Sequence, residues 1–197
     1  MTDHSKWQVA RLADAVASPW RNGGGVTREL AVWPDARDWA WRISVADVEQ
    51  DGPFSSFDGV ARHFAVLSGA GVRLDVDGAV HTLDATSAPF AFDGGARTGC
   101  TLIAGATRDF NLMTVRSRGQ SLMQRASGTR RQTLTAPTVV AVYVLAGGGT
   151  LQVEDDAPLS LPPHSLAWRA LPAGTAVALE ASAALWMEIA QTEGAAR

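Results

Sequence analysis

The amino-acid sequence predicts an all-β protein made of two tandem jelly-roll barrels, and three observations support this fold class. Apolar residues recur in short runs, and many of these runs alternate with polar residues as half-buried strands do. Glycine, proline and aspartate separate the runs, and no long amphipathic helix is indicated. Several runs also recur in the second part of the chain. Short strands with glycine-rich hairpins, duplicated once in 197 residues, are typical of the double-stranded β-helix, or cupin, architecture.

The composition limits the function classes. Of the 197 residues, 46% are hydrophobic, so the chain can bury the core of one large β domain or of two fused halves. The formal net charge of -3 argues against a nucleic-acid or anionic-membrane surface, and a small-molecule or protein partner fits better. The single Cys100 excludes an intrachain disulfide. No apolar run approaches a membrane span or a signal-peptide core, so a cytoplasmic location is expected.

The first expected strand, Trp7–Leu12, precedes a glycine stretch at residues 19–30, which reads Pro-Trp-Arg-Asn-Gly-Gly-Gly-Val-Thr-Arg-Glu-Leu. Its three glycines open onto an alternating strand. A phosphate loop would continue with Lys and Ser or Thr at the start of a helix, which excludes that motif here. We interpret the glycines as backbone that passes close to a barrel mouth, with Asn22 and Thr27 as ligand contacts on either side.

The next strand, Trp39–Ala46, alternates strictly, so its two faces differ. One face is predicted to be core and consists of Trp39, Trp41, Ile43 and Val45. The other face carries Arg42 and Ser44 among alanines, and it either lines a polar cavity or faces solvent. Residues 51–59 contain two Phe side chains among turn-forming residues, which indicates an ordered loop.

Short strands and hairpins continue to the end of the chain. In the first half they are expected at residues 62–67, 72–76, 90–92, 101–104 and 110–115. In the second half they are expected at residues 139–145, 150–153, 165–168, 176–179 and 184–189. Residues 66–76 resemble 144–153, and residues 110–114 resemble 185–189, which indicates two copies of one barrel motif.

The arginine-rich segment at residues 116–132 contains no acidic residue. Its glycines and scattered Ser and Thr indicate a solvated connector between the halves more than a nucleic-acid arm. We therefore expect an N-terminal cupin half at residues 1–118 and a C-terminal cupin half at residues 119–197, joined in one compact unit.

Metal binding is not predicted. A metal-binding cupin would show two histidines separated by one residue, a Glu a few positions later and another His on a later strand. The histidines of this chain are isolated, and they are His4, His63, His81 and His164. We therefore expect neither a metal nor a cofactor. His81 and His164 are interpreted as surface or loop residues, whereas His63 is either structural or faces a pocket.

Nucleophilic catalysis is not indicated either. Cys100 lacks a nearby basic group that would lower its pKa and is interpreted as a core residue. No serine stands in a Gly-x-Ser-x-Gly elbow. The candidate acids and bases are each interpreted as structural, and they are Glu29, Asp47, Asp51 and Asp109.

Several polar residues stand where apolar or turn residues would suffice. The predicted ligand-binding set at the mouth of one barrel is Asn22, Thr27, Arg28, Arg42, Ser44, His63 and Asn111. Two arginines suggest an anion, and because the guanidinium fork matches a carboxylate, a small carboxylate metabolite is the expected ligand. The alternative is that these arginines form salt bridges with Glu29 or Asp47 at the barrel end.

Four segments together resemble the HutD/Ves family, namely residues 19–30, Trp41-Arg42-Ile43-Ser44-Val45-Ala46, Asp51-Gly52-Pro53-Phe54-Ser55 and Asp109-Phe110-Asn111-Leu112-Met113. The resemblance implies an RmlC-like bicupin with two barrel halves in one chain. It also implies an association with bacterial histidine utilisation, in which a regulatory, metabolite-sensing function is proposed and no reaction is firmly assigned.

The expected function is a non-enzymatic regulatory protein that binds a small carboxylate of histidine breakdown, such as urocanate or a formyl-glutamate. The alternative is a metal-independent cupin enzyme, an isomerase or a hydrolase, with His63 or an Asp as its base. A third hypothesis, suggested by the seven Trp residues, is an interaction scaffold that forms a homodimer through exposed sheet edges.

Overall fold

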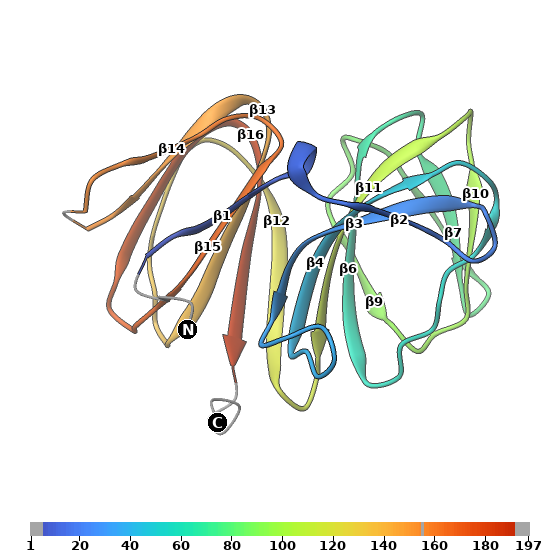
Figure 1. Cartoon of the computed structure of the whole chain (residues 1–197), viewed down its shortest axis with the longest axis horizontal. Coiled ribbons are helices and arrows are strands. Elements are labelled where there is room, and N and C mark those ends of the chain that lie inside the picture. The colour runs from blue at the N-terminus through green and yellow to red at the C-terminus, as the bar shows by residue number, and fades with distance from the viewer. Residues whose placement is uncertain (1–5, 155, 192–197) are drawn as a thin grey trace. The chain divides into compact units, whose positions relative to one another are not determined.

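The fold is all-β, as the sequence predicts. The computed structural model describes residues 6–154 and 156–191, and within these ranges sixteen strands account for nearly all of the regular structure (Figure 1). The helical structure in the same ranges is a single 3-10 turn, η1 (Leu12–Asp14). No helix in the described part of the chain is long and apolar enough to cross a membrane.

The chain forms two compact units. The first unit is residues 15–118, and the second unit combines the described residues up to Asp14 with those from Gly119 onward. The sequence had placed the N-terminal residues in the first half. They belong to the second unit because β1 (Gln8–Arg11) pairs antiparallel with β15 (Ser165–Leu171), with Gln8 opposite Trp168.

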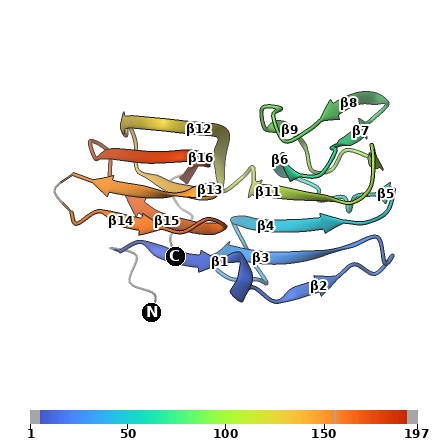
Figure 2. The same ribbon diagram turned by 90° about the horizontal axis from the view of Figure 1, so that it is seen from above.

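Ten strands form the first unit. They are β2 (Ala17–Pro19), β3 (Gly25–Trp33), β4 (Trp41–Val48), β5 (Gly52–Pro53), β6 (Val60–Ser68), β7 (Val72–Val76), β8 (Ala79–Leu83), β9 (Phe90–Asp93), β10 (Thr98–Leu102) and β11 (Thr107–Val115). One sheet has the order β2-β3-β4-β11-β6-β9 and the other the order β5-β10-β7-β8 (Figure 2). A hydrophobic core draws on both sheets and includes Phe64 and Val66 from the larger sheet and Leu74 and Cys100 from the smaller one.

The second unit is built on long, bent strands. Besides β1 and β15 it contains β12 (Gly119–Thr133), β13 (Thr138–Val153), β14 (Leu159–Leu161) and β16 (Ala176–Gln191). The sheet order is β1-β15-β13-β16-β12, and β14 pairs with β13. Register shifts occur in β12 between Ala126 and Gly128 and in β13 between Val144 and Gly149. Such bulges bend a strand, which lets one strand follow a curved sheet around its core.

The connector predicted at residues 116–132 is instead mostly strand. Residues 119–133 form β12, which pairs with β16 over nearly its whole length. Gly128 has a φ of +69° and lies at the bulge that interrupts this pairing. The arginines of the segment did not prevent strand formation, because alternation in a strand leaves one row of side chains toward solvent.

The two faces of β4 differ as predicted. Trp41, Ile43 and Val45 are almost fully buried on one face. The opposite face carries Arg42, Ser44 and Ala46 and lines a cavity of the first unit. Of the two alternatives that the sequence left for this second face, the structure therefore supports the polar cavity.

Glycine is required for different reasons along the stretch before β3. Gly23 has a φ of +70°, whereas a Cβ added at Gly25 would lie 2.2 Å from the backbone carbonyl oxygen of Asp47. At Gly24 a Cβ would meet only the Asn22 side chain, at 3.4 Å. The sequence predicted a close approach of this stretch to a barrel mouth, whereas the close approach at Gly25 is to the backbone of the paired strand β4.

We expect Gly25→Ala to lower the free energy of unfolding by more than about 1 kcal/mol, because backbone on two paired strands has to separate to admit the methyl group. Gly24→Ala is the matched control and should have the smaller effect. Urea unfolding of both variants measures the difference. Equal stability of the two variants would contradict this explanation of Gly25.

Candidate functional site

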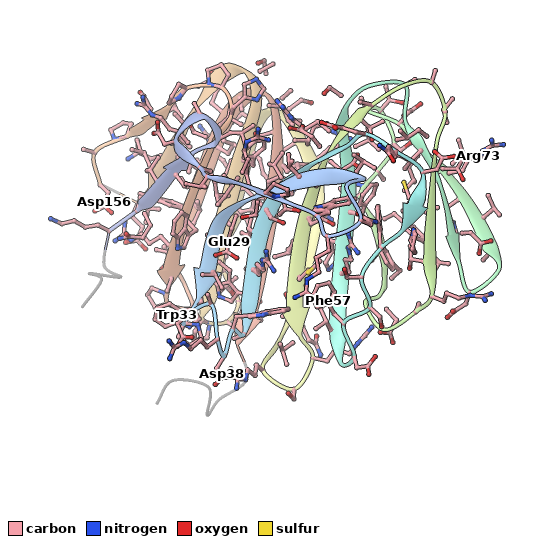
Figure 3. The ribbon with its side chains drawn as sticks, turned by 45° about the vertical axis from the view of Figure 1, so that its right-hand side comes forward. Glu29, Trp33, Asp38, Phe57, Arg73 and Asp156 are labelled. Carbon is pink, nitrogen blue, oxygen red and sulfur yellow. The ribbon has the colours of Figure 1, made fainter. Side chains whose placement is uncertain are left out.

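A cavity of about 600 Å³ lies in the first unit. Its lining contains three arginines and no acidic residue. The charged and polar lining residues are Arg21, Arg42, Arg62, Ser18, Asn22, Thr27, Ser44, Ser55 and Asn111. The remaining lining residues are Trp20, Phe54, Phe57, Met113, Pro19, Pro53 and Ala46. Figure 3 labels Phe57, which belongs to this lining, and Glu29 on β3, which does not.

Strand alternation and register bring the polar residues of the wall together. Asn111 on β11 stands opposite Ser44 on β4, and Met113 stands opposite Arg42. On the other side of β11, Met113 stands opposite Arg62 of β6. Because residues two apart on a strand share a face, these five side chains project from one face of the sheet. The wall therefore comes from three strands that are distant in sequence.

Arg62 is a buried cation. Its side chain is 7% exposed, and its Nε and Nη2 donate to Oδ1 of Asn111 at 3.0 and 2.7 Å. The guanidinium carbon lies 4.6 Å from the ring centroid of Phe54 and 5.4 Å from that of Phe92. Burial lowers the pKa of Arg62 to about 10, so the group remains charged at neutral pH. No described carboxylate forms an ion pair with it, and its hydrogen-bond partner is a neutral amide.

Two further arginines line the cavity with more exposure to solvent. Nε of Arg42 lies 2.8 Å from Oε2 of Glu29, although the N–H is not aligned for a hydrogen bond. Arg21 is exposed and forms no ion pair with any residue that the structure describes. The cavity therefore carries an excess of positive charge. Glu29 partly compensates Arg42, whereas Arg21 and Arg62 form no ion pair with a described residue.

The glycine stretch and the loop after β5 complete the lining. Nε1 of Trp20 donates to Oγ1 of Thr27 at 2.8 Å, and the rings of Trp20 and Phe54 meet edge to face at 6.2 Å. Oδ1 of Asn22 accepts from the backbone N–H of Gly24 at 3.1 Å. The contacts of Trp20 hold two aromatic side chains in the lining, and ligand pockets commonly combine such aromatic surface with a few polar groups.

Arg28 does not reach the cavity, contrary to the expectation from the sequence. Its Nη1 lies 2.6 Å from Oδ2 of Asp47. Arg108 also donates to Asp47, from Nε to Oδ1 at 2.6 Å and from Nη2 to Oδ2 at 3.1 Å. The hydrogen bond from Arg108 is the main reason that the pKa of Asp47 lies below its usual value. Arg28 therefore follows the alternative of a salt bridge, because strand alternation turns it away from its neighbour Thr27, which does line the cavity.

His63 is also outside the cavity lining, whereas its neighbour Arg62 is inside it. Consecutive strand residues point to opposite faces, so one of the two must face away. His63 stands opposite Leu112, a fully buried residue on the face away from the cavity. The sequence prediction therefore missed Arg62. The available signal was a charged residue between apolar positions of an alternating strand.

Asp109 is a second buried ionisable group on the cavity side of β11. Strand alternation places it on the same face as Asn111 and Met113, and its side chain is fully buried. Burial raises its pKa to about 7, although Thr107 donates a hydrogen bond to Oδ2 at 3.3 Å. Oδ1 accepts no hydrogen bond from any described residue. The group thus changes its protonation near neutral pH.

The described residues contain no group of three or more His, Cys, Asp and Glu placed to hold a metal. His4 lies outside the described residues. His164 is exposed, and His81 is half-buried, with its ring 4.2 Å from that of Phe90. Burial raises the pKa of the Cys100 thiol to about 12, so this side chain is a neutral part of the core.

At three positions the second unit has apolar residues where the first has buried polar ones. In the internal repeat, Asn111 corresponds to Trp186, and the ladders around β16 match those around β11. On this register Arg62 corresponds to Val140 and Asp109 to Ala184, both buried. The same architecture therefore forms without the polar residues, and the fold itself does not require them.

Comparison with known proteins agrees with the cupin-like fold. A cupin 2 conserved barrel domain protein from Leptotrichia buccalis is 13% identical and has a TM-score of 0.57, with coverage of 94% of this chain and 96% of that chain. At this identity the likeness concerns the fold alone. It confirms the all-β, cupin-like architecture predicted from the sequence.

Three closer relatives share both sequence and family. A Pseudomonas putida protein, described as an uncharacterized 21.2 kDa protein in the hutC 3' region, is 39% identical over 140 residues, which are 69% of this chain and 73% of the relative. Protein Ves of Cronobacter sakazakii is 38% identical over 134 residues, or 67% and 72% of the two chains. The structure of HutD from Pseudomonas fluorescens SBW25 is 34% identical, with a TM-score of 0.83 over 95% of this chain and 100% of that one. The HutD family model matches residues 12–187. The chain therefore belongs to the HutD family.

Proposed function

We propose that this protein is a non-enzymatic regulatory protein that binds a small carboxylate metabolite in the cavity of the first unit. The observation that carries the proposal is Arg62, a cation that is almost fully buried and has a neutral amide as its hydrogen-bond partner. A desolvated charge without an ion-pair partner in contact is costly, and a bound anion reduces that cost. A carboxylate is the anion whose geometry matches the guanidinium fork.

The rest of the lining defines the ligand further. Asn111 turns its amide oxygen to Arg62, which leaves its amide nitrogen as a donor to a ligand oxygen. Trp20 and Phe54 offer apolar surface to a planar or aliphatic part of the ligand. Arg21 and Arg42 provide positive charge for a second polar group. A cavity of about 600 Å³ is in the size range of small-metabolite sites.

Two metabolites of histidine breakdown suit this lining. Urocanate combines one carboxylate with a conjugated, planar imidazole, whereas N-formyl-L-glutamate carries two carboxylates. The link to histidine breakdown is supported by the Pseudomonas putida relative, which is described by its position in the hutC 3' region. Urocanate would use the aromatic side chains, and N-formyl-L-glutamate would use the additional arginines.

Calorimetry with both metabolites tests the proposal. We expect at least one of them to bind with a dissociation constant well below about 1 mM, which corresponds to about 4 kcal/mol of binding free energy. The methyl ester of urocanate is the matched control, because it keeps the planar ring but lacks the negative charge, and it should bind more weakly than urocanate. Failure of both carboxylates to bind below the millimolar range would contradict the proposal.

A second candidate function is a metal-independent cupin enzyme, an isomerase or a hydrolase acting on a small carboxylate. Asp109 favours it, because a carboxyl with a pKa of about 7 is suited to proton transfer at neutral pH, although Asp109 is fully buried and does not itself line the cavity. His63, the base expected from the sequence, lies outside the cavity lining. Incubation of urocanate and N-formyl-L-glutamate with the purified protein would show turnover that Asp109→Asn abolishes. Unchanged substrate after prolonged incubation would contradict this alternative.

A further inference from the structure

Asp109 is a buried carboxyl for which neither the fold nor simple anion binding gives a reason. It is 0% exposed, its Oδ1 accepts no hydrogen bond from a described residue, and the second unit has Ala184 at the corresponding position. It shares a strand face with Asn111, two residues away, and stands opposite Ala46, which lines the cavity. A negative charge on Asp109 would therefore lie in the same wall as the proposed carboxylate site.

The charged and titratable groups around Asp109 come from several strands. Arg62 on β6 favours its ionised form, and Asp47 on β4 disfavours it. The charge of Asp47 is already compensated by Arg28 and Arg108. Cys100 on β10 is a neutral thiol, because burial raises its pKa to about 12. Arg62 is therefore the neighbour whose electrostatic effect would change most when an anion enters the cavity.

We propose that anion binding at Arg62 is coupled to the uptake of one proton by Asp109. The coupling rests on the proposed carboxylate site. A bound carboxylate compensates the charge of Arg62, so Asp109 loses the attraction that favours its ionised form and experiences a new negative charge. The Asp109 carboxylate then takes a proton from solvent and becomes a neutral carboxylic acid. The anion and the proton enter together, and the net charge of the cavity is unchanged.

This coupling makes affinity depend on pH. In the free protein the pKa of Asp109 is about 7, so below pH 7 the carboxyl is already protonated and affinity is nearly constant. Above pH 7 each binding event requires a proton, and affinity falls by up to about tenfold per pH unit. Because the coupling is reciprocal, the same factor describes how strongly the ligand raises the pKa of Asp109.

Calorimetry with N-formyl-L-glutamate in two buffers tests the coupling, because both carboxylates of this probe stay ionised near neutral pH. The difference in binding heat between phosphate and Tris, at about pH 7.5, gives the number of protons taken up. We expect the wild-type protein to take up between about 0.5 and 0.8 proton, because about three quarters of Asp109 is ionised at this pH before binding. Asp109→Asn and Asp109→Ala should bind with no proton uptake and with affinity independent of pH. His81→Gln is the matched control and should retain the uptake, because it removes a titratable group that does not line the cavity.

The outcomes are distinguishable. Wild-type binding without proton uptake, or uptake that persists in both Asp109 variants, would overturn the coupling and leave the carboxylate site in place. Absence of binding by the wild-type protein at every pH would overturn the proposed site and the coupling together. Circular dichroism reports whether the variants are folded, and the pH dependence of wild-type affinity decides the question even if one of them is not.

Discussion

Arg62→Met is expected to weaken carboxylate binding by at least about 100-fold, which corresponds to about 3 kcal/mol, the scale of losing a desolvated charge pair. Arg62 is the most deeply buried arginine of the cavity lining, so its interaction with an anion is little screened by water. Calorimetry with the tighter-binding of urocanate and N-formyl-L-glutamate measures the loss.

The Arg62→Met variant should fold. Methionine keeps an unbranched, apolar side chain between Phe54 and Phe92, and removal of a desolvated cation costs little when an apolar group replaces it. Val140 occupies the corresponding position in the second unit, which shows that the architecture accepts an apolar residue there.

Arg28→Met is the matched control. It removes an arginine of the same unit that pairs with Asp47 and does not line the cavity. Its affinity for the ligand should stay within about threefold of wild type, although its stability should fall by about 1 kcal/mol with the loss of a charge-assisted hydrogen bond. Wild-type affinity in Arg62→Met, or an equal loss in both variants, would remove the basis for placing the carboxylate at Arg62.

Compared with the wild type, the Asp109→Ala variant is expected to become more stable as pH rises. The pKa of Asp109 is about 7 in the folded protein, compared with 3.8 for an exposed aspartate. Between these values the folded state binds more protons than the unfolded state, so the free energy of unfolding of the wild type falls as pH rises from about 4 to about 7. The full difference of about 3 pH units corresponds to about 4 kcal/mol. The variant has no carboxyl at position 109, so its free energy of unfolding lacks this decrease with rising pH.

Urea unfolding of wild type and Asp109→Ala at about pH 4 and pH 8 measures this effect, because the cost of the small cavity left by alanine is common to both pH values. The stability difference between the two proteins should shift toward the variant by up to about 4 kcal/mol over this range. Asp47→Asn is the opposite control. In the wild type the pKa of Asp47 is lowered in the folded state. The ionised Asp47 therefore contributes stability above about pH 4, and this contribution is lost as pH falls further. A pH-independent difference for Asp109→Ala would show that Asp109 ionises normally.

The two buried ionisable groups together explain where a binding site is expected. Burial lowers the pKa of Arg62 and raises that of Asp109, so the folded first unit disfavours both charged forms, whereas the second unit uses Val140 and Ala184 at the corresponding positions. Proteins retain such costly groups where function needs them. The same reasoning favours the first unit over the second as the site of ligand binding.

The sequence by itself determined the all-β fold class, the internal repeat and membership of the HutD family. It also predicted the core face of β4 and left open whether the opposite face lines a cavity or meets solvent, because strict alternation of apolar and polar residues depends on local backbone geometry alone. The alternation of side chains along a strand also limits which residues can line the cavity. Thr27 and Arg28 are adjacent in one strand, as are Arg62 and His63, so each pair could supply only one residue to the cavity.

Which member of each pair faces the cavity was decided by the tertiary structure. Arg28 turns to Asp47, which lies on a different strand, and Arg62 turns to Asn111, 49 residues further along the chain. The pairing of β12 with β16 likewise converted a predicted connector into a strand. The protonation of Asp109 also depends on neighbours from β4 and β6. Burial and electrostatic interaction act through space, so they exist only when distant segments come together, and the sequence pattern does not encode them locally.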